Sequence, residues 1–160
     1  MKIENIITLI VAIAIIGTMI YIGARFVTGL YSKNSLTSVS AEDLKKAYAE
    51  KIATETDVNK LTAQGATLVK GNQLENGMIN LKRATELEPK YRDAWVWLGY
   101  AQIKNNDLPN AIISLNKAAE IDPIYPDTFK YLTLAYEQSG DTASAKTAQG
   151  KYDFLIKDKE

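Results

Sequence analysis

Two hydrophobic patterns follow one another along this chain of 160 residues. The first is continuous, because residues 5–24 contain no charged side chain. At ~1.5 Å of rise per residue, a helix of this length crosses the ~30 Å hydrocarbon core of a bilayer. From residue 41 onward, apolar residues instead recur every three or four positions, which predicts amphipathic helices. The sequence therefore predicts an all-α protein in which an N-terminal transmembrane helix precedes a helical domain.

We expect residues 1–27 to form an uncleaved, single-pass membrane anchor. A secretory signal has a shorter apolar stretch of ~7–15 residues that ends at a small-x-small cleavage site. The only Ala-x-Ala of residues 1–40 instead lies in the middle of the stretch. Positive charges flank both ends equally, so the positive-inside rule sets no orientation. By association with signal anchors, we expect the helical domain on the extracytoplasmic, periplasmic-like side. Small residues that allow a partner helix to approach are Ala14, Gly17, Thr18 and Gly23.

A linker and a lead-in helix separate the anchor from the rest of the chain. Residues 28–40 are rich in Ser, Thr, Gly and Asn and have no apolar period, which is typical of a flexible linker. Ser40 and Asp43 form a capping-box pattern at the start of a helix predicted over 41–54. We expect the segment 41–57 to cap the domain by packing against it. The alternative is a helix that binds a partner.

A period of 34 residues relates the remaining sequence. Glu88-Pro89 recurs as Asp122-Pro123, and Trp95 is followed at this spacing by Phe129. The period divides the chain into units at 58–91, 92–125 and 126–160. Other pairs at this spacing are Gly65 and Gly99, Gly77 and Ala111, Leu81 and Leu115, and Ala84 and Ala118. The pattern predicts helices at 59–71, 75–88, 93–105, 109–121, 127–139 and 143–157.

The central unit resembles the tetratricopeptide repeat (TPR) family. Its residues at that family's signature positions are Trp95, Leu98, Gly99, Ala111, Leu115, Ala118 and Pro123. Gln102 departs from the pattern, which prefers an aromatic residue there, and the third unit departs at Gln149 and Tyr152. The resemblance implies an α-solenoid of about three helix-turn-helix repeats, which bury their apolar faces by stacking on one another.

In the TPR family, the first helices of successive repeats line a concave groove that holds a partner protein. The resemblance implies a groove that is apolar at its centre with lysines along one edge, which suits an amphipathic helix or an extended peptide with some acidic residues. The chaperone-binding specificity of some members is not expected, because their asparagines are replaced. A lead-in helix folded back over the groove is an equal alternative. The groove residues are Thr62, Ala66, Val69, Lys70, Val96, Tyr100, Ile103, Lys104, Lys130, Leu134 and Glu137.

The composition contains little that points to catalysis. Nineteen basic and nineteen acidic residues cancel, so the chain has no electrostatic reason to bind nucleic acid. Cysteine and histidine are absent, which removes thiol nucleophiles, imidazole bases and the usual zinc ligands. We therefore expect no enzymatic activity, cofactor, metal or small-molecule substrate. Trp97 and Tyr131 occupy equivalent positions and are expected to pack between adjacent helices rather than to form a ligand site.

These patterns favour a membrane-anchored adaptor that assembles a complex by binding a protein partner. The alternative is a permanent structural subunit of a membrane complex or filament, held by its transmembrane helix and its repeat surfaces. A third hypothesis is a chaperone-like assembly factor that binds several clients.

Overall fold

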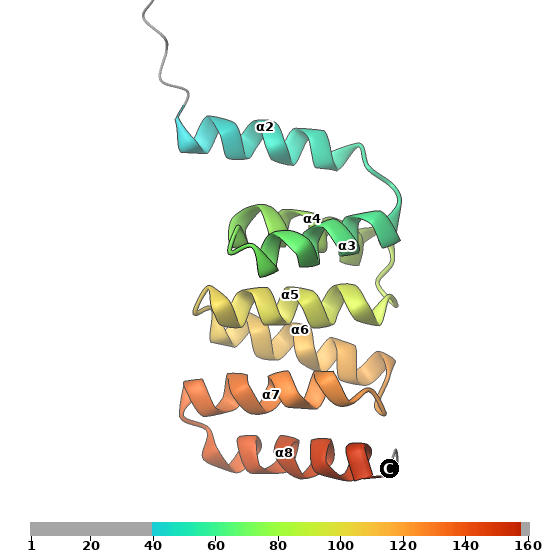
Figure 1. Cartoon of the computed structure of the whole chain (residues 1–160), viewed down its shortest axis with the longest axis vertical. Helices are drawn as coiled ribbons and strands as arrows, with labels where there is room; N and C mark the ends of the chain where they lie inside the picture. The colour runs from blue at the N-terminus through green and yellow to red at the C-terminus, as the bar shows by residue number, and fades with distance from the viewer. Residues whose placement is uncertain (1–39, 158–160) are drawn as a thin grey trace, which may run out of the picture. The chain divides into compact units, whose positions relative to one another are not determined.

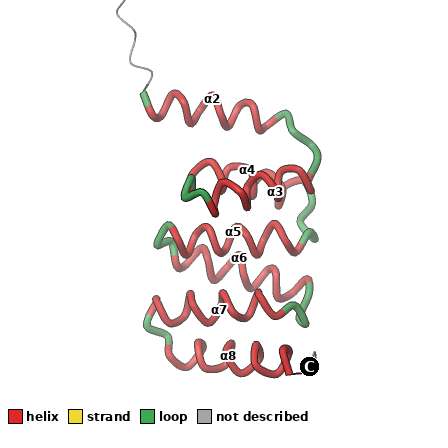
Figure 2. The backbone as a smooth tube through the Cα atoms, in the orientation of Figure 1, coloured by secondary structure: helices red, strands yellow, loops and turns green. Residues whose placement is uncertain are grey.

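Residues 40–157 are described by the computed structural model, and within them helices alternate with short turns and no strand is present (Figures 1 and 2). Each helix begins and ends within one residue of the predicted bounds, so the all-α prediction is confirmed. The helices are α2 (Ala41–Ala53), α3 (Val58–Lys70), α4 (Leu74–Leu87), α5 (Arg92–Lys104), α6 (Leu108–Ile121), α7 (Pro126–Ser139) and α8 (Thr142–Lys157).

The predicted anchor, residues 1–27, and the predicted linker up to residue 39 lie outside the described residues. The four small residues proposed for packing in the membrane, at positions 14, 17, 18 and 23, lie outside them as well. Within residues 40–157, no helix combines the length and the hydrophobicity that crossing a membrane requires.

The turns inside the three helix pairs share one backbone feature. Asn72, Asn106 and Gly140 have φ of 61°, 58° and 83°, and they stand 34 residues apart. Asparagine and glycine are the residues that adopt this left-handed conformation most readily. In each turn the chain therefore leaves the first helix and reverses within a few residues, which makes α3 and α4, α5 and α6, and α7 and α8 antiparallel pairs.

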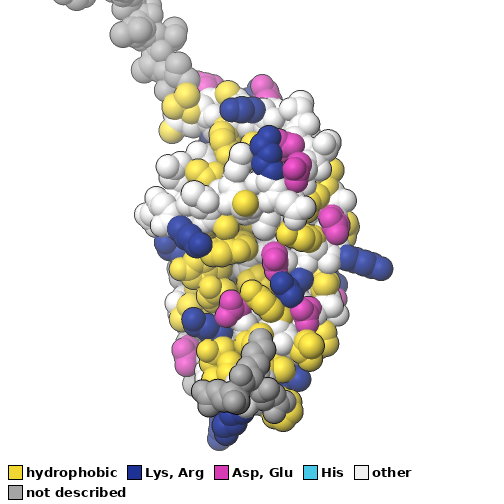
Figure 3. All heavy atoms as spheres, turned by 45° about the vertical axis from the view of Figure 1, so that its right-hand side comes forward, with side chains coloured by type: hydrophobic (Ala, Val, Ile, Leu, Met, Phe, Trp, Pro, Cys, Tyr) yellow, Lys and Arg dark blue, Asp and Glu magenta, His cyan; other side chains and the backbone are white. Residues whose placement is uncertain are grey.

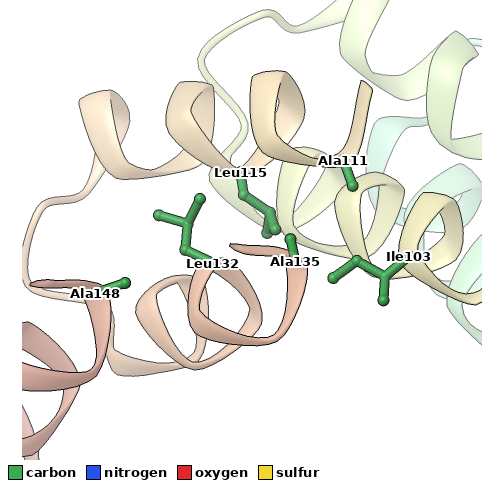
Figure 4. Close-up of a cluster of buried hydrophobic side chains, with 6 residues drawn as sticks. All are labelled: Ile103, Ala111, Leu115, Leu132, Ala135 and Ala148. Atoms are coloured by element: carbon green, nitrogen blue, oxygen red, sulfur yellow. The ribbon is translucent and has the colours of Figure 1, made fainter. Parts of the chain in front are cut away.

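The two helices of a pair cross closely at a glycine. A Cβ atom built on Gly65 would lie 2.6 Å from Cγ of Leu81, and one on Gly99 would lie 2.5 Å from Cγ of Leu115. Both leucines are completely buried. The small residue thus allows the large one of the partner helix to fill the crossing, and the pairs then stack so that α3, α5 and α7 follow one another (Figure 1). Figure 4 shows the shared core of the second and third pairs.

Gln102, which departs from the TPR pattern, is accommodated by a polar partner. The hydroxyl of Ser114 donates a hydrogen bond of 2.7 Å to Oε1 of Gln102, and both side chains are buried. One repeat earlier, the buried Asn80 occupies the position of Ser114 and accepts a 2.9 Å hydrogen bond from the hydroxyl of Tyr48. These polar groups are paired, so their burial carries only a modest cost.

The lead-in helix α2 contacts the first pair through a few long side chains. Ile52 is buried in a cluster with Leu61 and Ala84, and Nζ of Lys45 lies 3.6 Å from Oε2 of Glu75. However, no Cα atom of α2 comes within 8 Å of a Cα atom in another described helix. A cavity of about 740 Å³ lies between α2 and α3.

The polarity of α3 explains this distance. Its residues Lys60, Gln64 and Thr67 are exposed, whereas the residues at the same repeat positions in α5 and α7 are buried against the preceding helix. A polar face gives α2 little apolar area to cover. The three residues and the cavity lie on a different face of α3 from Thr62 and Ala66 of the predicted groove.

Candidate protein-interaction site

An unbroken series of contacts between lysine and aromatic side chains crosses α3, α5 and α7. Nζ of Lys70 lies 4.9 Å from the ring centroid of Trp97, and the Trp97 ring meets the Tyr100 ring edge-on at 5.9 Å. The Tyr100 ring is 4.8 Å from that of Tyr131, at an interplanar angle of 32°. Together with Lys104, we refer to these residues as the aromatic–lysine strip.

The repeat period places these side chains together. Trp97 and Tyr131 stand 34 residues apart, at the same position of α5 and α7. Tyr100 follows Trp97 by three residues and so lies on the same side of α5. Because α5 stacks between α3 and α7, its two aromatic rings reach Lys70 on one neighbour and Tyr131 on the other.

One end of the strip is positively charged. Lys70 and Lys104 are the last residues of α3 and α5, where a cation is favoured by the helix dipole. Nζ of Lys104 donates a 3.3 Å hydrogen bond to the carbonyl oxygen of Val69, so it lies next to the end of α3. No carboxylate between residues 40 and 157 pairs with either lysine. The two ammonium groups are therefore held in place by the protein without being neutralised.

The other end of the strip is neutral. Burial raises the pKa of the Tyr131 hydroxyl, and the nearby carboxylate of Asp127 raises it further. The hydroxyl is therefore protonated throughout the physiological pH range and can both donate and accept a hydrogen bond.

An ion-pair cluster fixes the turn that leads into α7. Nη1 of Arg92 lies 2.6 Å from Oδ2 of Asp122, and the guanidinium also pairs with Asp93. The centre of the guanidinium is 3.7 Å from the ring centroid of Tyr125, within the range of a cation–π contact. Because Arg92 begins α5 and Tyr125 precedes α7, this cluster ties together the starts of the two helices that carry the aromatic rings.

The structure divides the residues of the predicted groove into two groups. Six side chains are accessible to a partner. Of these, Tyr100 and Leu134 are half-buried, and Lys70, Lys104, Lys130 and Glu137 are exposed. The other five are at most 8% exposed and support the surface from below: Thr62, Ala66, Val69, Val96 and Ile103.

Sequence reasoning placed Trp97 and Tyr131 only in the packing between helices. They do contact Tyr100, but both rings are half-buried and retain exposed area. Their shared repeat position next to Val96 and Lys130 was the signal that could have placed them at the site. Elsewhere in the described part of the chain, no group of three or more acidic side chains could hold a metal ion.

Glu55 lies at the rim of the cavity between α2 and α3. Among the described carboxyl groups, its pKa departs furthest from the ordinary value. The ammonium of Lys60 bonds to it and, with the backbone amides of Asp57 and Thr56, lowers its pKa to about 2. The contribution of Glu55 to stability is therefore present above its unfolded pKa of about 4.3 and is lost as the pH falls through about 2.

We expect Lys60→Met to raise the pKa of Glu55 toward its ordinary value, as followed by carbon-detected NMR of the glutamate carboxyls during an acid titration. Lys51→Met is the control, because Lys51 borders the same cavity without a bond to Glu55. An unchanged pKa in Lys60→Met would contradict the assigned cause.

A family model described as a tetratricopeptide repeat matches residues 93–125, which include α5 and α6. Among similar solved structures, a MamA point mutant is 22% identical with a TM-score of 0.59, over 79% of this chain and 90% of that one. A crystal structure of MamA is 23% identical with a TM-score of 0.62, over 71% and 67% of the two chains. An MSR-1 MamA structure is 21% identical with a TM-score of 0.62, over 81% and 73%. No curated protein matches the chain.

At these identities the likeness to MamA shows the fold alone. With the matched repeat in the second unit and the stacked helix pairs, it identifies a TPR-like solenoid, as the sequence predicted. Repeats of this kind form scaffolds for protein–protein interaction.

Proposed function

We propose that this chain is a membrane-anchored adaptor whose aromatic–lysine strip binds a segment of a partner protein and so assembles a complex at the membrane. The observation that carries this proposal is the strip itself: three adjoining aromatic rings that end at two lysines without a carboxylate partner in the described region. Aromatic side chains are typical anchors of binding surfaces, because they bury a large area at a small cost in conformational entropy.

The chemistry of the strip favours an extended segment or an amphipathic helix with both apolar and acidic side chains. The apolar side chains would cover Tyr100 and Leu134, and carboxylates would meet Lys70 and Lys104. Complementary charge increases the association rate and selects among partners more than it adds affinity. No catalytic step is part of this proposal.

The proposed anchor, residues 1–27, contributes by restricting the protein to a membrane. A tethered binding surface meets membrane-bound partners at a high effective concentration, so that a small interface is sufficient. By association with signal anchors, we propose that the repeats lie on the extracytoplasmic side.

Exposed hydrophobic side chains away from the strip favour the second hypothesis, a permanent structural subunit. Ile113 on α6 is 59% exposed and Ile124 in the following turn is 69% exposed. Hydrophobic side chains lie between charged ones over the face shown in Figure 3. In a permanent complex, such side chains would be covered by neighbouring subunits.

We expect Tyr100→Glu to reduce partner recovery at least tenfold when the full-length chain is isolated from its native membrane in mild detergent. The new carboxylate would interrupt the aromatic surface beside Trp97 and Tyr131. Val96→Glu is unsuitable for this test, because Val96 is only 5% exposed and a buried charge would unfold the helix pair. Recovery is measured by quantitative mass spectrometry, and circular dichroism verifies that the variant is folded.

Ile113→Glu is the matched control, since it adds the same charge on the exposed surface of α6. The adaptor proposal requires this variant to retain the partner. The opposite outcome is that Tyr100→Glu also retains every partner and that removal of residues 1–30 releases them. The partners would then bind the proposed membrane anchor, and the structural-subunit hypothesis would replace the adaptor hypothesis.

A further inference from the structure

A second surface feature, separate from the strip, is a cavity of about 370 Å³ between α6, α7 and α8. Its apolar floor comes from α7, on a different face from the one that carries Tyr131. We refer to it as the α7–α8 pocket. Its lining residues are Asn116, Phe129, Leu132, Tyr136, Ser144, Thr147, Ala148 and Lys151.

Two residues by which the third unit differs from the second make this pocket apolar. A smaller cavity of about 280 Å³ has a mainly polar lining, which includes Lys82 and Gln102, the residues one repeat before Asn116 and Tyr136 of the α7–α8 pocket. At the positions of Gln102 and its partner Ser114, the third unit has Tyr136 and Ala148. The polar pair is thus replaced by an aromatic ring and a methyl group, both of which line the α7–α8 pocket.

The walls contributed by α8 are small, which keeps the pocket open. Ser144, Thr147 and Ala148 line it from that helix. Figure 4 shows the methyl group of Ala148 directed toward Leu132 of α7.

A single positive charge stands at the edge of this apolar space. Nζ of Lys151 lies 5.9 Å from the ring centroid of Phe129 and 5.8 Å from that of Phe154, at the outer limit of cation–π contacts. Over residues 40–157 no carboxylate pairs with Lys151. Phe154 is 59% exposed, so its ring is available to a bound molecule.

We propose that the α7–α8 pocket is a docking site for a protein segment in which an aromatic side chain stands next to a carboxylate. The aromatic side chain enters between Phe129, Leu132 and Ala148, and the carboxylate pairs with Lys151. The volume lies near the lower end of the ~300–1,000 Å³ that ligand pockets occupy, which suits one large side chain. Charge complementarity selects the acidic neighbour, because the pocket carries one lysine and no carboxylate.

The test uses the isotopically labelled full-length chain in mild detergent and two dipeptide probes, N-acetyl-Phe-Asp-amide and N-acetyl-Phe-Asn-amide. They have nearly the same shape and differ in charge. We expect the aspartate probe to shift the methyl NMR signals of Leu132 and Ala148 and to bind at least fivefold more tightly than the asparagine probe. Lys151→Gln should remove this difference without changing the affinity for the asparagine probe.

Two further variants separate the pocket from its surroundings. Lys146→Gln removes an exposed charge on α8 outside the pocket lining, and it should leave both affinities unchanged. Ala148→Leu should fill the pocket and abolish binding of both probes, while an unchanged circular dichroism spectrum shows that the helices are retained.

The inference is overturned if the aspartate probe leaves the Leu132 and Ala148 signals unshifted, or if it binds Lys151→Gln as tightly as the original chain. It does not rest on the strip. Binding of the probes by Tyr100→Glu would therefore separate this site from the proposed adaptor surface.

Discussion

Replacing Gly99 by leucine should destabilise the repeats by at least about 3 kcal/mol, the upper part of the range for overpacked cores. The Cβ atom alone would lie 2.5 Å from Cγ and 2.8 Å from Cδ2 of Leu115, and 3.3 Å from the carbonyl oxygen of Ala111. Leu115 is fully buried, so its side chain cannot move out of the way into solvent. The carbonyl belongs to the backbone of α6, so the remaining leucine atoms can be accommodated only if the two helices separate.

The chain provides both the probe and the control for this experiment. Its two tryptophans, Trp95 and Trp97, both lie in α5, so their fluorescence during a urea titration follows the helix that carries Gly99. Gly150→Leu makes the same change within α8, where a Cβ meets nothing within 4 Å. It should be neutral or stabilise by up to about 1 kcal/mol, because glycine is a poor helix former. Equal urea midpoints for the two variants would contradict the close crossing of α5 and α6.

The sequence predicted the repeat fold well because the fold depends on local and periodic signals. The 34-residue spacing aligned three copies, and Pro89 and Pro123 with the residues at the turns bounded the helices. Small residues at matching positions of the first two units, Gly65 with Gly77 and Gly99 with Ala111, indicated where the helices cross. None of these inferences required knowledge of which side chains meet across the stack.

The candidate site was predicted less completely because burial depends on neighbouring helices. The resemblance to the TPR family assigned Val69 and Ile103 to the binding face, but α5 and α7 cover these side chains. The same pattern kept Trp97 and Tyr131 out of the site, although half-buried rings serve both packing and surface. A residue at the boundary between two faces of a helix cannot be assigned to one of them from spacing alone.

The distance of α2 from α3 was missed for a related reason. An apolar stripe on residues 41–54 predicts that the helix packs, but the partner surface decides how closely. Lys60, Gln64 and Thr67 stand where the later units have apolar or small buried residues, and comparing the three copies at these positions would have revealed this. The membrane anchor and its orientation depend on residues outside the described range, and they stay predictions.

The buried hydrogen bond between Ser114 and Gln102 contributes to the stability of the second repeat. Ser114→Ala should lower the free energy of unfolding by about 2 kcal/mol, because it removes the 2.7 Å hydrogen bond to Oε1 of Gln102. Gln102 is only 6% exposed, so water cannot fully replace the lost donor. The cost comes mainly from the carboxamide left without its partner, and only in part from the hydrogen bond itself.

If the unpaired carboxamide is the main cost, a double substitution should lower the free energy of unfolding less than Ser114→Ala alone. Gln102→Leu with Ser114→Ala replaces both polar groups, using the leucine that the first unit has at this position and the alanine of the third. Removing both partners of a buried hydrogen bond can be nearly neutral, so the urea midpoint of the double variant should return close to that of the original chain. If the effects of the two substitutions instead add, Ser114 contributes through packing. The polar pair is then not what allows Gln102 to stand where the repeat pattern prefers an aromatic ring.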